Sequence, residues 1–237
     1  MMKALVTGST QGIGKAIAIE LVKNGYEVIV HCSNDLDKAK SVQEEIGASG
    51  AVICDLFNLD DTYKLCEKTG KVDVLVLNAS VQYKQEWTAI TREKLSEQID
   101  VNFKSSVILM QEYIPAMMQK GFGRVVTIGS VNQHRRHREL SIYSATKCAV
   151  MSMVQNVAKE VAPYGVTVNN VSPGAIQTPR NKEVYDNQTL RKKVESQIPL
   201  GKFGKSEDVA KAVAFLVSKD GEYITGADIS VDGGMRL

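Results

Sequence analysis

The sequence of 237 residues lacks the features that mark several classes of protein. Its four cysteines, Cys32, Cys54, Cys66 and Cys148, are widely spaced and form no Cys-x-x-Cys pair. This spacing argues against a zinc site and against a disulfide framework. No stretch approaches the ~18 apolar residues of a membrane span. The formal charge is nearly balanced, with 29 basic and 27 acidic residues, so we expect neither a nucleic-acid partner nor an anionic membrane surface as a ligand.

Linkers and biased segments are also missing. No Pro/Gly-rich linker, internal repeat or low-complexity tract divides the chain, and Met1-Met2-Lys3 leads into an apolar stretch without a signal-peptide pattern. We therefore expect one domain over residues 1–237, located in the cytoplasm. At this length, a hydrophobic content of 43% suffices for one sizeable core.

Apolar runs alternate with helical patterns along the chain. The predicted strands lie near residues 3–7, 27–31, 51–54, 72–77, 124–129, 165–171 and 227–231. The predicted helices lie near residues 13–24, 36–46, 60–68, 91–119, 142–162 and 206–218. This alternation predicts a Rossmann-type α/β fold, a doubly wound parallel sheet of about seven strands with helices on both faces. Ligands of such sheets bind beyond the carboxyl ends of the strands.

A glycine-rich turn follows the first predicted strand and precedes the first predicted helix. It reads Gly8-Ser9-Thr10-Gln11-Gly12-Ile13-Gly14. Such a turn lets the backbone approach a pyrophosphate closely, and the helix N-terminus supplies free N–H groups. The alternative is a tight connection without a ligand.

A second motif places a phenol and an ammonium four residues apart, at Tyr143 and Lys147. Four residues make about one helical turn, so both side chains project from one face. A cation near a phenol favours the phenolate and lowers its pKa, which suits proton transfer. A solvated helix face is the alternative.

Together the two motifs resemble the short-chain dehydrogenase/reductase family, whose pattern is T-G-x-x-x-G-x-G near the start and a serine with Tyr-x-x-x-Lys in the second half. Thr7 to Gly14 match the first part, and Ser130, Tyr143 and Lys147 match the second. Further matches span nearly the whole chain, at Cys54-Asp55-Leu56, Asn78-Ala79, Val101-Asn102 and Ser172-Pro173-Gly174. One departure is Leu77-Asn78-Ala79-Ser80, where the family commonly has Asn-Asn-Ala-Gly.

The resemblance implies an NAD(P)(H)-dependent oxidoreductase that transfers a hydride between nicotinamide and a carbonyl or secondary alcohol. It implies a catalytic tetrad of Asn102, Ser130, Tyr143 and Lys147. Tyr143 transfers the proton, Ser130 binds the substrate oxygen, Lys147 also binds the nicotinamide ribose, and Asn102 holds a relay water. It also implies a set of cofactor-binding residues: Gly8, Ser9, Thr10, Gln11, Gly12, Ile13, Gly14, Cys32, Ser33, Asn34, Asp55, Leu56, Asn78, Ala79, Tyr143, Lys147, Pro173, Gly174, Ile176 and Thr178. Residues 177–199 resemble the family's mobile substrate lid.

The end of the second predicted strand bears on the choice of cofactor. His31-Cys32-Ser33-Asn34 has no carboxylate where NAD-type members carry one, and this favours NADP(H) over NAD(H). No arginine lies there, so Ser33, Asn34 and His31 would hold the 2′-phosphate, with Asp35 near enough to compete.

A basic loop, Asn132 to Glu139, lies between Ser130 and Tyr143. Its Arg135 and Arg136 are candidate substrate residues, because guanidinium groups bind carboxylates and phosphates bidentately. We therefore favour a small polar substrate such as a sugar, polyol or sugar acid. The alternatives are a 3-oxoacyl-acyl-carrier-protein reductase and a dinucleotide-sensing regulator without turnover, and the loop itself could be solvated or contact another subunit.

Assembly is the last expectation. The predicted helices 91–119 and 142–162 carry apolar residues on more than one side: Val107, Leu109, Met110, Met117, Met118, Val150, Met151, Met153 and Val154. In the family these helices form a four-helix dimer contact, and the resemblance implies a homotetramer with pairing through residues 226–233.

Overall fold

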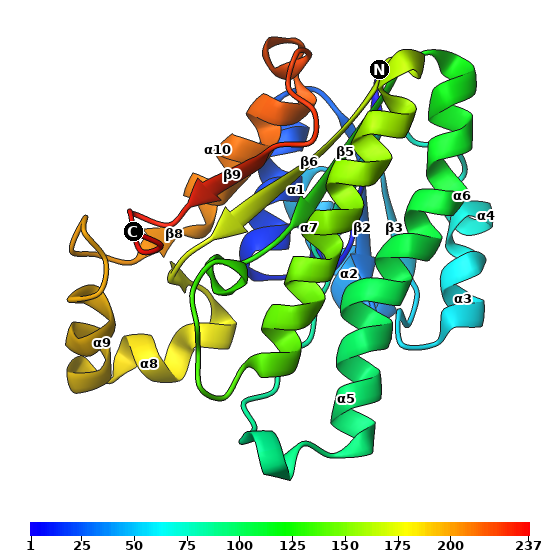
Figure 1. The fold of residues 1–237 in the computed structure, drawn as a ribbon. Helices are drawn as coiled ribbons and strands as arrows, with labels where there is room; N and C mark the ends of the chain where they lie inside the picture. Colours follow the sequence, from blue (N-terminus) through cyan, green and yellow to red (C-terminus); the bar gives the residue numbers. More distant parts are fainter.

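A seven-stranded parallel sheet forms the centre of the computed structural model, which describes residues 1–237 (Figure 1). The strand order is β3-β2-β1-β4-β5-β6-β9, and every neighbouring pair is parallel. The strands are β1 (Lys3–Val6), β2 (Glu27–Cys32), β3 (Gly50–Ile53), β4 (Val74–Leu77), β5 (Gly123–Ile128), β6 (Val166–Pro173) and β9 (Asp228–Val231). The predicted Rossmann-type fold is confirmed.

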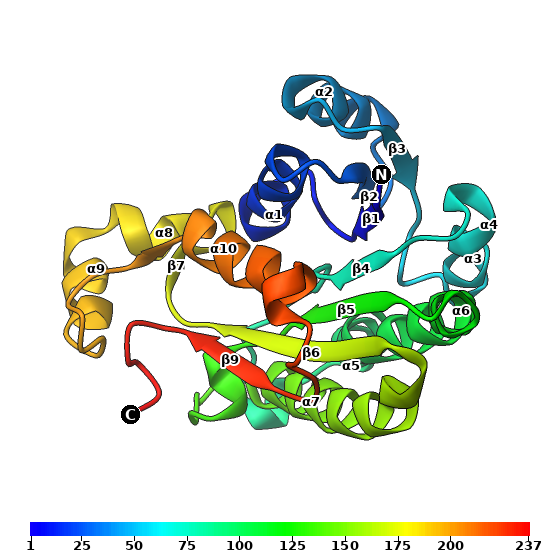
Figure 2. The same cartoon turned by 90° about the horizontal axis from the view of Figure 1, so that it is seen from above.

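Helices cover both faces of the sheet (Figure 2). One face carries α1 (Gly12–Lys23) and α10 (Ser206–Val217), whose apolar residues share a core with Val74 and Val76 of β4. The other face carries α6 (Ser105–Lys120) and α7 (Ser141–Val161), packed with Leu75 and Leu77. Successive residues of β4 therefore enter opposite cores, which explains why the whole strand is apolar.

The remaining helices have 11 residues or fewer, and the longest of them packs on β2 and β3. They are α2 (Leu36–Ile46), α3 (Leu59–Tyr63), α4 (Leu65–Thr69), α5 (Arg92–Ile99), α8 (Lys182–Asp186) and α9 (Gln188–Glu195). Two-residue strands β7 (Ile176–Gln177) and β8 (Gly204–Lys205) pair in a second small sheet. No helix combines the length and the apolar character needed to cross a bilayer.

Two helix predictions need correction. The expected helix near 60–68 is two helices, α3 and α4, separated at Lys64. The expected helix over 91–119 is interrupted by a π-turn, Asp100–Lys104, between α5 and α6. In that turn the Asn102 amide bonds to the backbone of Val81, which ties the helix to the segment after β4. The hydrophobic pattern does not report such a side-chain contact.

Because all seven strands are parallel, their carboxyl ends meet at one edge of the sheet. The segments that begin there contain Gly8 after β1, Cys54-Asp55 after β3, Asn78 after β4 and Ser130 after β5. The separate sequence motifs thus converge on one edge, as such sheets require of a ligand site.

Candidate active site

A cavity of about 840 Å³ follows this edge. All the site residues predicted from the sequence line it, except Ser9, His31 and Asn102. The candidate substrate residues Arg135 and Arg136 are among the lining residues. The segment predicted as a lid contributes Val184, Lys193 and further residues to the wall. A size of several hundred Å³ is typical of cofactor and small-molecule sites.

The glycine loop has the backbone shape that a pyrophosphate needs. Gly8 and Gly12 have φ of +61° and +56°, in the left-handed region that favours glycine. A Cβ at Gly14 would collide with the Gly8 carbonyl and the Asn78 amide. No side chain caps the N-terminus of α1, so its first N–H groups remain available to an anion. These residues fit the diphosphate of a dinucleotide.

Buried polar groups hold this loop from beneath. The Gly8 N–H donates to His31 Nδ1 (3.0 Å), and His31 Nε2 lies 3.0 Å from the Cys54 carbonyl. Ser9 Oγ accepts from the His31 N–H at 3.0 Å. From the side, Asn78 Nδ2 donates to the carbonyls of Thr7 (2.9 Å) and Gly8 (3.0 Å). The loop is therefore bonded to both strands that flank β1.

These contacts correct two expectations. Ser9 is fully buried and faces His31 rather than the cavity. His31 is 1% exposed and serves the loop, so it does not hold a 2′-phosphate. Burial lowers the pKa of His31 to about 4, and the imidazole is therefore neutral, accepting at Nδ1 and donating from Nε2 to Cys54.

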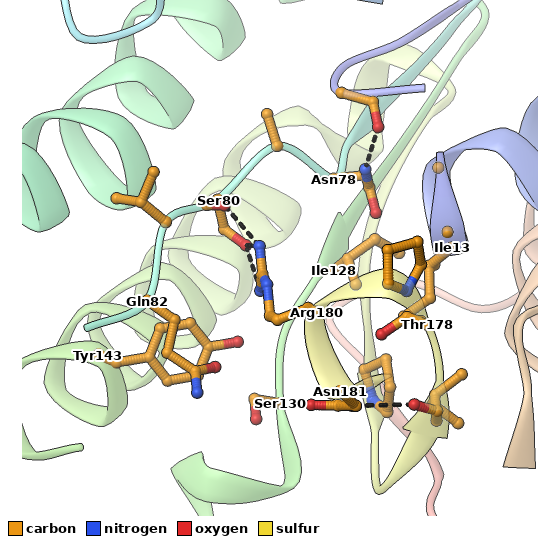
Figure 3. A pocket seen from close by; sticks show the side chains of 18 of the residues that line it. Ile13, Asn78, Ser80, Gln82, Ile128, Ser130, Tyr143, Thr178, Arg180 and Asn181 are labelled. Atoms are coloured by element: carbon orange, nitrogen blue, oxygen red, sulfur yellow. Dashed lines mark hydrogen bonds between the residues drawn. The ribbon is translucent and has the colours of Figure 1, made fainter. Parts of the chain in front are cut away.

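Ser130, Tyr143 and Lys147 meet at the middle of the cavity, where Figure 3 shows Tyr143 and Ser130. Ser130 ends the segment after β5, and its Oγ accepts from the Asn132 N–H (3.2 Å). Tyr143 and Lys147 lie one turn apart on α7 and are both almost fully buried. Lys147 Nζ donates to the Ile128 carbonyl (2.7 Å) and lies 5.6 Å from the centroid of the Tyr143 ring.

The electrostatics of this group differ from the sequence-based expectation. Burial raises the pKa of Tyr143, while the guanidinium of Arg180 and the hydroxyl of Ser130 act in the opposite direction. Burial, with a smaller effect of Arg180, lowers the pKa of Lys147 to about 7. The expected lowering of the phenol pKa by Lys147 is therefore wrong for this structure, because desolvation outweighs it and Arg180 is the cation acting on the phenol.

Asn102 lies behind the cavity wall. Its Oδ1 accepts from the Val81 N–H (2.8 Å), and its Nδ2 donates to the Val81 carbonyl (2.9 Å) and to Thr146 Oγ1 (3.2 Å). Thr146 is in turn bonded to the carbonyl of Tyr143 (2.8 Å). The side chain thus positions α7 and the segment after β4, and any relay water would have to use its backbone.

Arg180 and Lys38 are among the lining residues that the sequence analysis did not predict. Arg180, next to the small strand β7, donates to Ser80 on the opposite wall (Figure 3). Lys38, in the first turn of α2, donates to Gln11 Oε1 of the glycine loop (3.2 Å). Arg180 lies within the segment predicted as a lid, but nothing in the sequence indicates that it reaches Ser80. Lys38 follows a helix cap, Asp35, and its approach to the glycine loop depends on tertiary structure.

The basic loop is partly structural. His134 Nε2 lies 2.7 Å from the carboxylate of Asp228 in β9, which is also bonded by Gln133 (2.8 Å). Arg135 donates to Gln197 Oε1 (3.2 Å), which connects the loop to the end of the predicted lid. Arg138 pairs with Glu86 (3.4 Å), and His137 Nδ1 accepts from the Glu139 N–H (3.3 Å). Arg136 also lines the cavity, and it is the one arginine of the loop without a side-chain hydrogen bond or ion pair.

Comparison with known proteins agrees with this geometry. A family model described as enoyl-(acyl carrier protein) reductase matches residues 8–236. The 3-oxoacyl-[acyl-carrier-protein] reductase of Rickettsia felis is 38% identical over 99% of this chain and 96% of its own. A 3-oxoacyl-(acyl-carrier-protein) reductase structure from Agrobacterium tumefaciens has a TM-score of 0.94 at 34% identity, covering 98% of this chain and 93% of that one. The chain belongs to the short-chain dehydrogenase/reductase family.

A further structure widens the range of substrates among its relatives. An Agrobacterium tumefaciens protein provisionally named 2-deoxy-D-gluconate 3-dehydrogenase has a TM-score of 0.91 at 30% identity, covering 99% of this chain and 96% of that one. As a short-chain dehydrogenase/reductase, the protein is an NAD(P)-dependent oxidoreductase acting on carbonyl or alcohol groups. The predicted family and reaction class are confirmed.

The pH dependence of the free energy of unfolding should reveal that the imidazole of His31 is buried and neutral in this short-chain dehydrogenase/reductase. The pKa of His31 in the folded protein, about 4, lies below its ordinary value of 6.5. Between pH 4 and pH 6.5 the unfolded chain therefore binds a proton at this residue that the folded protein does not bind. The free energy of unfolding should therefore fall as the pH decreases through that window, by up to about 1.4 kcal/mol per pH unit from this group. Urea unfolding at several pH values measures the slope.

Two variants make the comparison specific. His31→Gln should lose this part of the slope, whereas His134→Gln removes an exposed histidine and should keep it. Equal slopes in wild type and His31→Gln would contradict the assignment, whatever the absolute stability of the variant.

Proposed function

We propose that the enzyme uses NADP(H) to interconvert a carbonyl and a secondary alcohol on a small polar substrate with an anionic group, such as a sugar acid. The observation that carries this proposal is the charge at the substrate end of the cavity. Lys84, Arg135, Arg136, Arg180 and Lys193 line this end. The one carboxylate among its lining residues, Glu97, already bonds to Tyr83 (2.6 Å) and Lys94 (3.2 Å). Such surplus positive charge favours an anion.

The roles of the chain's own residues follow from their positions. The bound nicotinamide supplies or accepts the hydride. Tyr143, kept protonated by burial, would donate its proton to the substrate oxygen in the direction of reduction. Ser130 would donate a hydrogen bond to the same oxygen as negative charge develops there. Lys147, whose pKa is near 7, would share its proton with the ribose and the Tyr143 hydroxyl.

Preference for NADP(H) is supported by Lys38. Its ammonium lies beside Gln11, at the end of the cavity where Cys32, Ser33 and Asn34 also line the wall. The carboxylate of Asp35, which also lines this end, caps α2 by accepting from the Lys38 N–H (2.8 Å). The two Agrobacterium tumefaciens structures described above contain bound NADP. A 2′-phosphate bound there would meet the ammonium of Lys38.

A second candidate function is the reduction of 3-oxoacyl groups on acyl carrier protein. It is favoured by the reductases that are 38% and 34% identical to this chain over nearly its whole length. The same cations could bind the phosphodiester of a phosphopantetheine arm at the cavity mouth. The two candidates differ in where the negative charge lies relative to the reacting carbon.

A substrate panel tests the proposed function. Oxidation of D-gluconate and 2-deoxy-D-gluconate with NADP⁺ should exceed reduction of acetoacetyl-N-acetylcysteamine with NADPH, and the corresponding enoyl thioester tests the activity named in the family model. Tyr143→Phe should lose at least about a hundredfold in kcat/KM with an unchanged Kd for NADPH, because only the proton donor is removed. Faster thioester reduction would favour the second candidate, and no turnover of any compound would overturn both.

Cofactor choice can be tested at Lys38. Lys38→Ala should raise the Kd for NADPH by roughly tenfold and leave the Kd for NADH nearly unchanged, since only the former carries the 2′-phosphate. Lys15→Ala is the matched control, because Lys15 pairs with Glu45 and does not line the cavity. Fluorescence titration measures both constants. An equal loss for both cofactors in Lys38→Ala would show that the residue shapes the loop rather than binds the phosphate.

A homotetramer remains our proposal for the assembly. Of the nine apolar residues named on these two helices, five pack in the core of the chain: Leu109, Met110, Met117, Val150 and Val154. Val107, Met118, Met151 and Met153 are only partly buried and remain available to a partner. Strand β9 ends the sheet order and is partly exposed, so its free edge could pair with another chain.

Light scattering at micromolar concentration should give about 104 kDa, four times the 25.9 kDa chain. Met153→Asp should shift the mass toward the monomer, because a buried charge at a subunit contact has no partner. Leu190→Asp, on α9 and away from this face, should not change the mass. A monomeric wild-type protein would contradict the proposed assembly.

A further inference from the structure

Arg180 spans the mouth of the active site. From its position near β7 it reaches the segment after β4, where Nη2 donates to the Ser80 carbonyl (2.6 Å) and Nη1 lies 3.2 Å from Ser80 Oγ. Figure 3 shows its guanidinium between Ser80 and the side chains of Tyr143 and Ser130. The two bonded residues are 100 positions apart in the sequence. The contact therefore fixes a cation in front of the proposed proton donor.

The hydroxyl of Ser80 helps to hold the guanidinium of Arg180 in place. The family pattern quoted above has glycine at this position, which would offer a carbonyl but no hydroxyl. With serine, both terminal nitrogens of the guanidinium gain an acceptor, since Nη2 also lies 3.3 Å from Ser80 Oγ. A group bonded at two nitrogens is restricted in rotation, so the unusual serine and the arginine act as a pair.

The guanidinium keeps unused binding capacity. An arginine has five N–H donors in a planar fork. Ser80 accepts on one side, and no carboxylate of the chain forms an ion pair with Arg180. Figure 3 shows the guanidinium on the side of the cavity that holds Tyr143, and its positive charge favours the phenolate form of that residue. An unneutralised cation in a cavity, with donors free, is a binding site for an anion.

We propose that Arg180, held by Ser80, binds a substrate carboxylate that lies one or two carbons from the reacting carbonyl. This proposal rests on the proposed function and narrows its substrate class to 2-oxo and 3-oxo acids and the corresponding hydroxy acids. The position of the reacting oxygen is the reason. Tyr143 must hydrogen-bond to that oxygen, and Arg180 lies beside the phenol, so an anion on its fork lies within a few bonds of the reacting carbon.

Substrates with a distant anion would need other residues. A carboxylate several carbons from the carbonyl, or the phosphodiester of a phosphopantetheine arm, would need the other cations that line the cavity, such as Arg135, Arg136 and Lys193. A 3-oxoacyl thioester carries no charge near its reacting carbon. Arg180 thus separates a short oxo acid from the substrates of the second candidate function.

Binding of malonate provides a test that does not require turnover. Isothermal titration should detect malonate binding to the wild-type enzyme, without cofactor and with NADP⁺, and weaker binding of dimethyl malonate. Arg180→Gln should weaken malonate binding by roughly ten- to a hundredfold, the range of a charge-assisted hydrogen bond. Arg191→Gln is the matched control, since Arg191 lies in the same segment but bonds to Glu195 (2.9 Å) and does not line the cavity.

Ser80→Gly refines the assignment. It keeps the backbone carbonyl that accepts from Nη2 and removes only the hydroxyl, so malonate binding should fall by a smaller factor, about two- to fivefold. Absence of malonate binding to wild type, or equal affinity in wild type and Arg180→Gln, would overturn the proposal. A fall in NADP⁺ affinity of Arg180→Gln with unchanged malonate binding would also overturn it and make Arg180 a cofactor ligand.

Turnover supplies the second readout. The kcat/KM of Arg180→Gln should fall roughly ten- to a hundredfold for acetoacetate and less than about threefold for methyl acetoacetate. An equal loss for acid and ester would show that Arg180 acts on Tyr143 alone and would contradict carboxylate binding. If wild type reduces neither compound, the proposed function fails for this class, while the malonate measurements still decide whether Arg180 binds a carboxylate.

Discussion

The position of the glycine loop is the constraint on which the rest of the site depends. His31 and Asn78 bond this loop to the segments that follow β3 and β4, so its backbone is fixed before any ligand binds. A dinucleotide seated on the loop can extend only along the carboxyl edge of the sheet. Its nicotinamide end must then approach the residues after β5 and on α7. The buried imidazole thus affects the reaction at a distance by deciding where the cofactor lies.

Burial sets the protonation of the catalytic group. Desolvation favours the neutral forms, and it raises the pKa of Tyr143 while lowering that of Lys147 to about 7. Arg180 adds a positive charge that favours phenolate and disfavours ammonium. An anionic substrate bound to Arg180 would reduce this influence and return both groups toward protonation. Burial already keeps the phenol protonated, so this change acts mainly on Lys147, whose pKa lies near 7.

Local patterns predicted the fold, the glycine loop and the Tyr143–Lys147 pair, because these depend on short-range rules, and the family resemblance implied the other cofactor-binding residues. The glycine loop, the buried strands and the Tyr143–Lys147 spacing each occupy a few consecutive residues. His31, Lys38 and Arg180 could not be assigned in this way. Each acts through a partner from another segment: His31 through Gly8 and Cys54, Lys38 through Gln11, and Arg180 through Ser80. The interruption of the long helix at the π-turn has the same origin, in the contact of Asn102 with Val81.

The chain is similar both to reductases and to dehydrogenases because its cofactor site and its substrate end are built from different parts of the fold. The residues that seat the cofactor and transfer the proton lie on the sheet edge and α7, where the fold restricts what each position can hold. The residues at the substrate end come from three connections, at 80–84, 132–139 and 180–197, which cross the surface and tolerate change. Sequence identity to a relative over the whole chain therefore reflects mainly the cofactor-binding and proton-transfer residues that the family shares. The charges on the three connections are a better guide to the substrate.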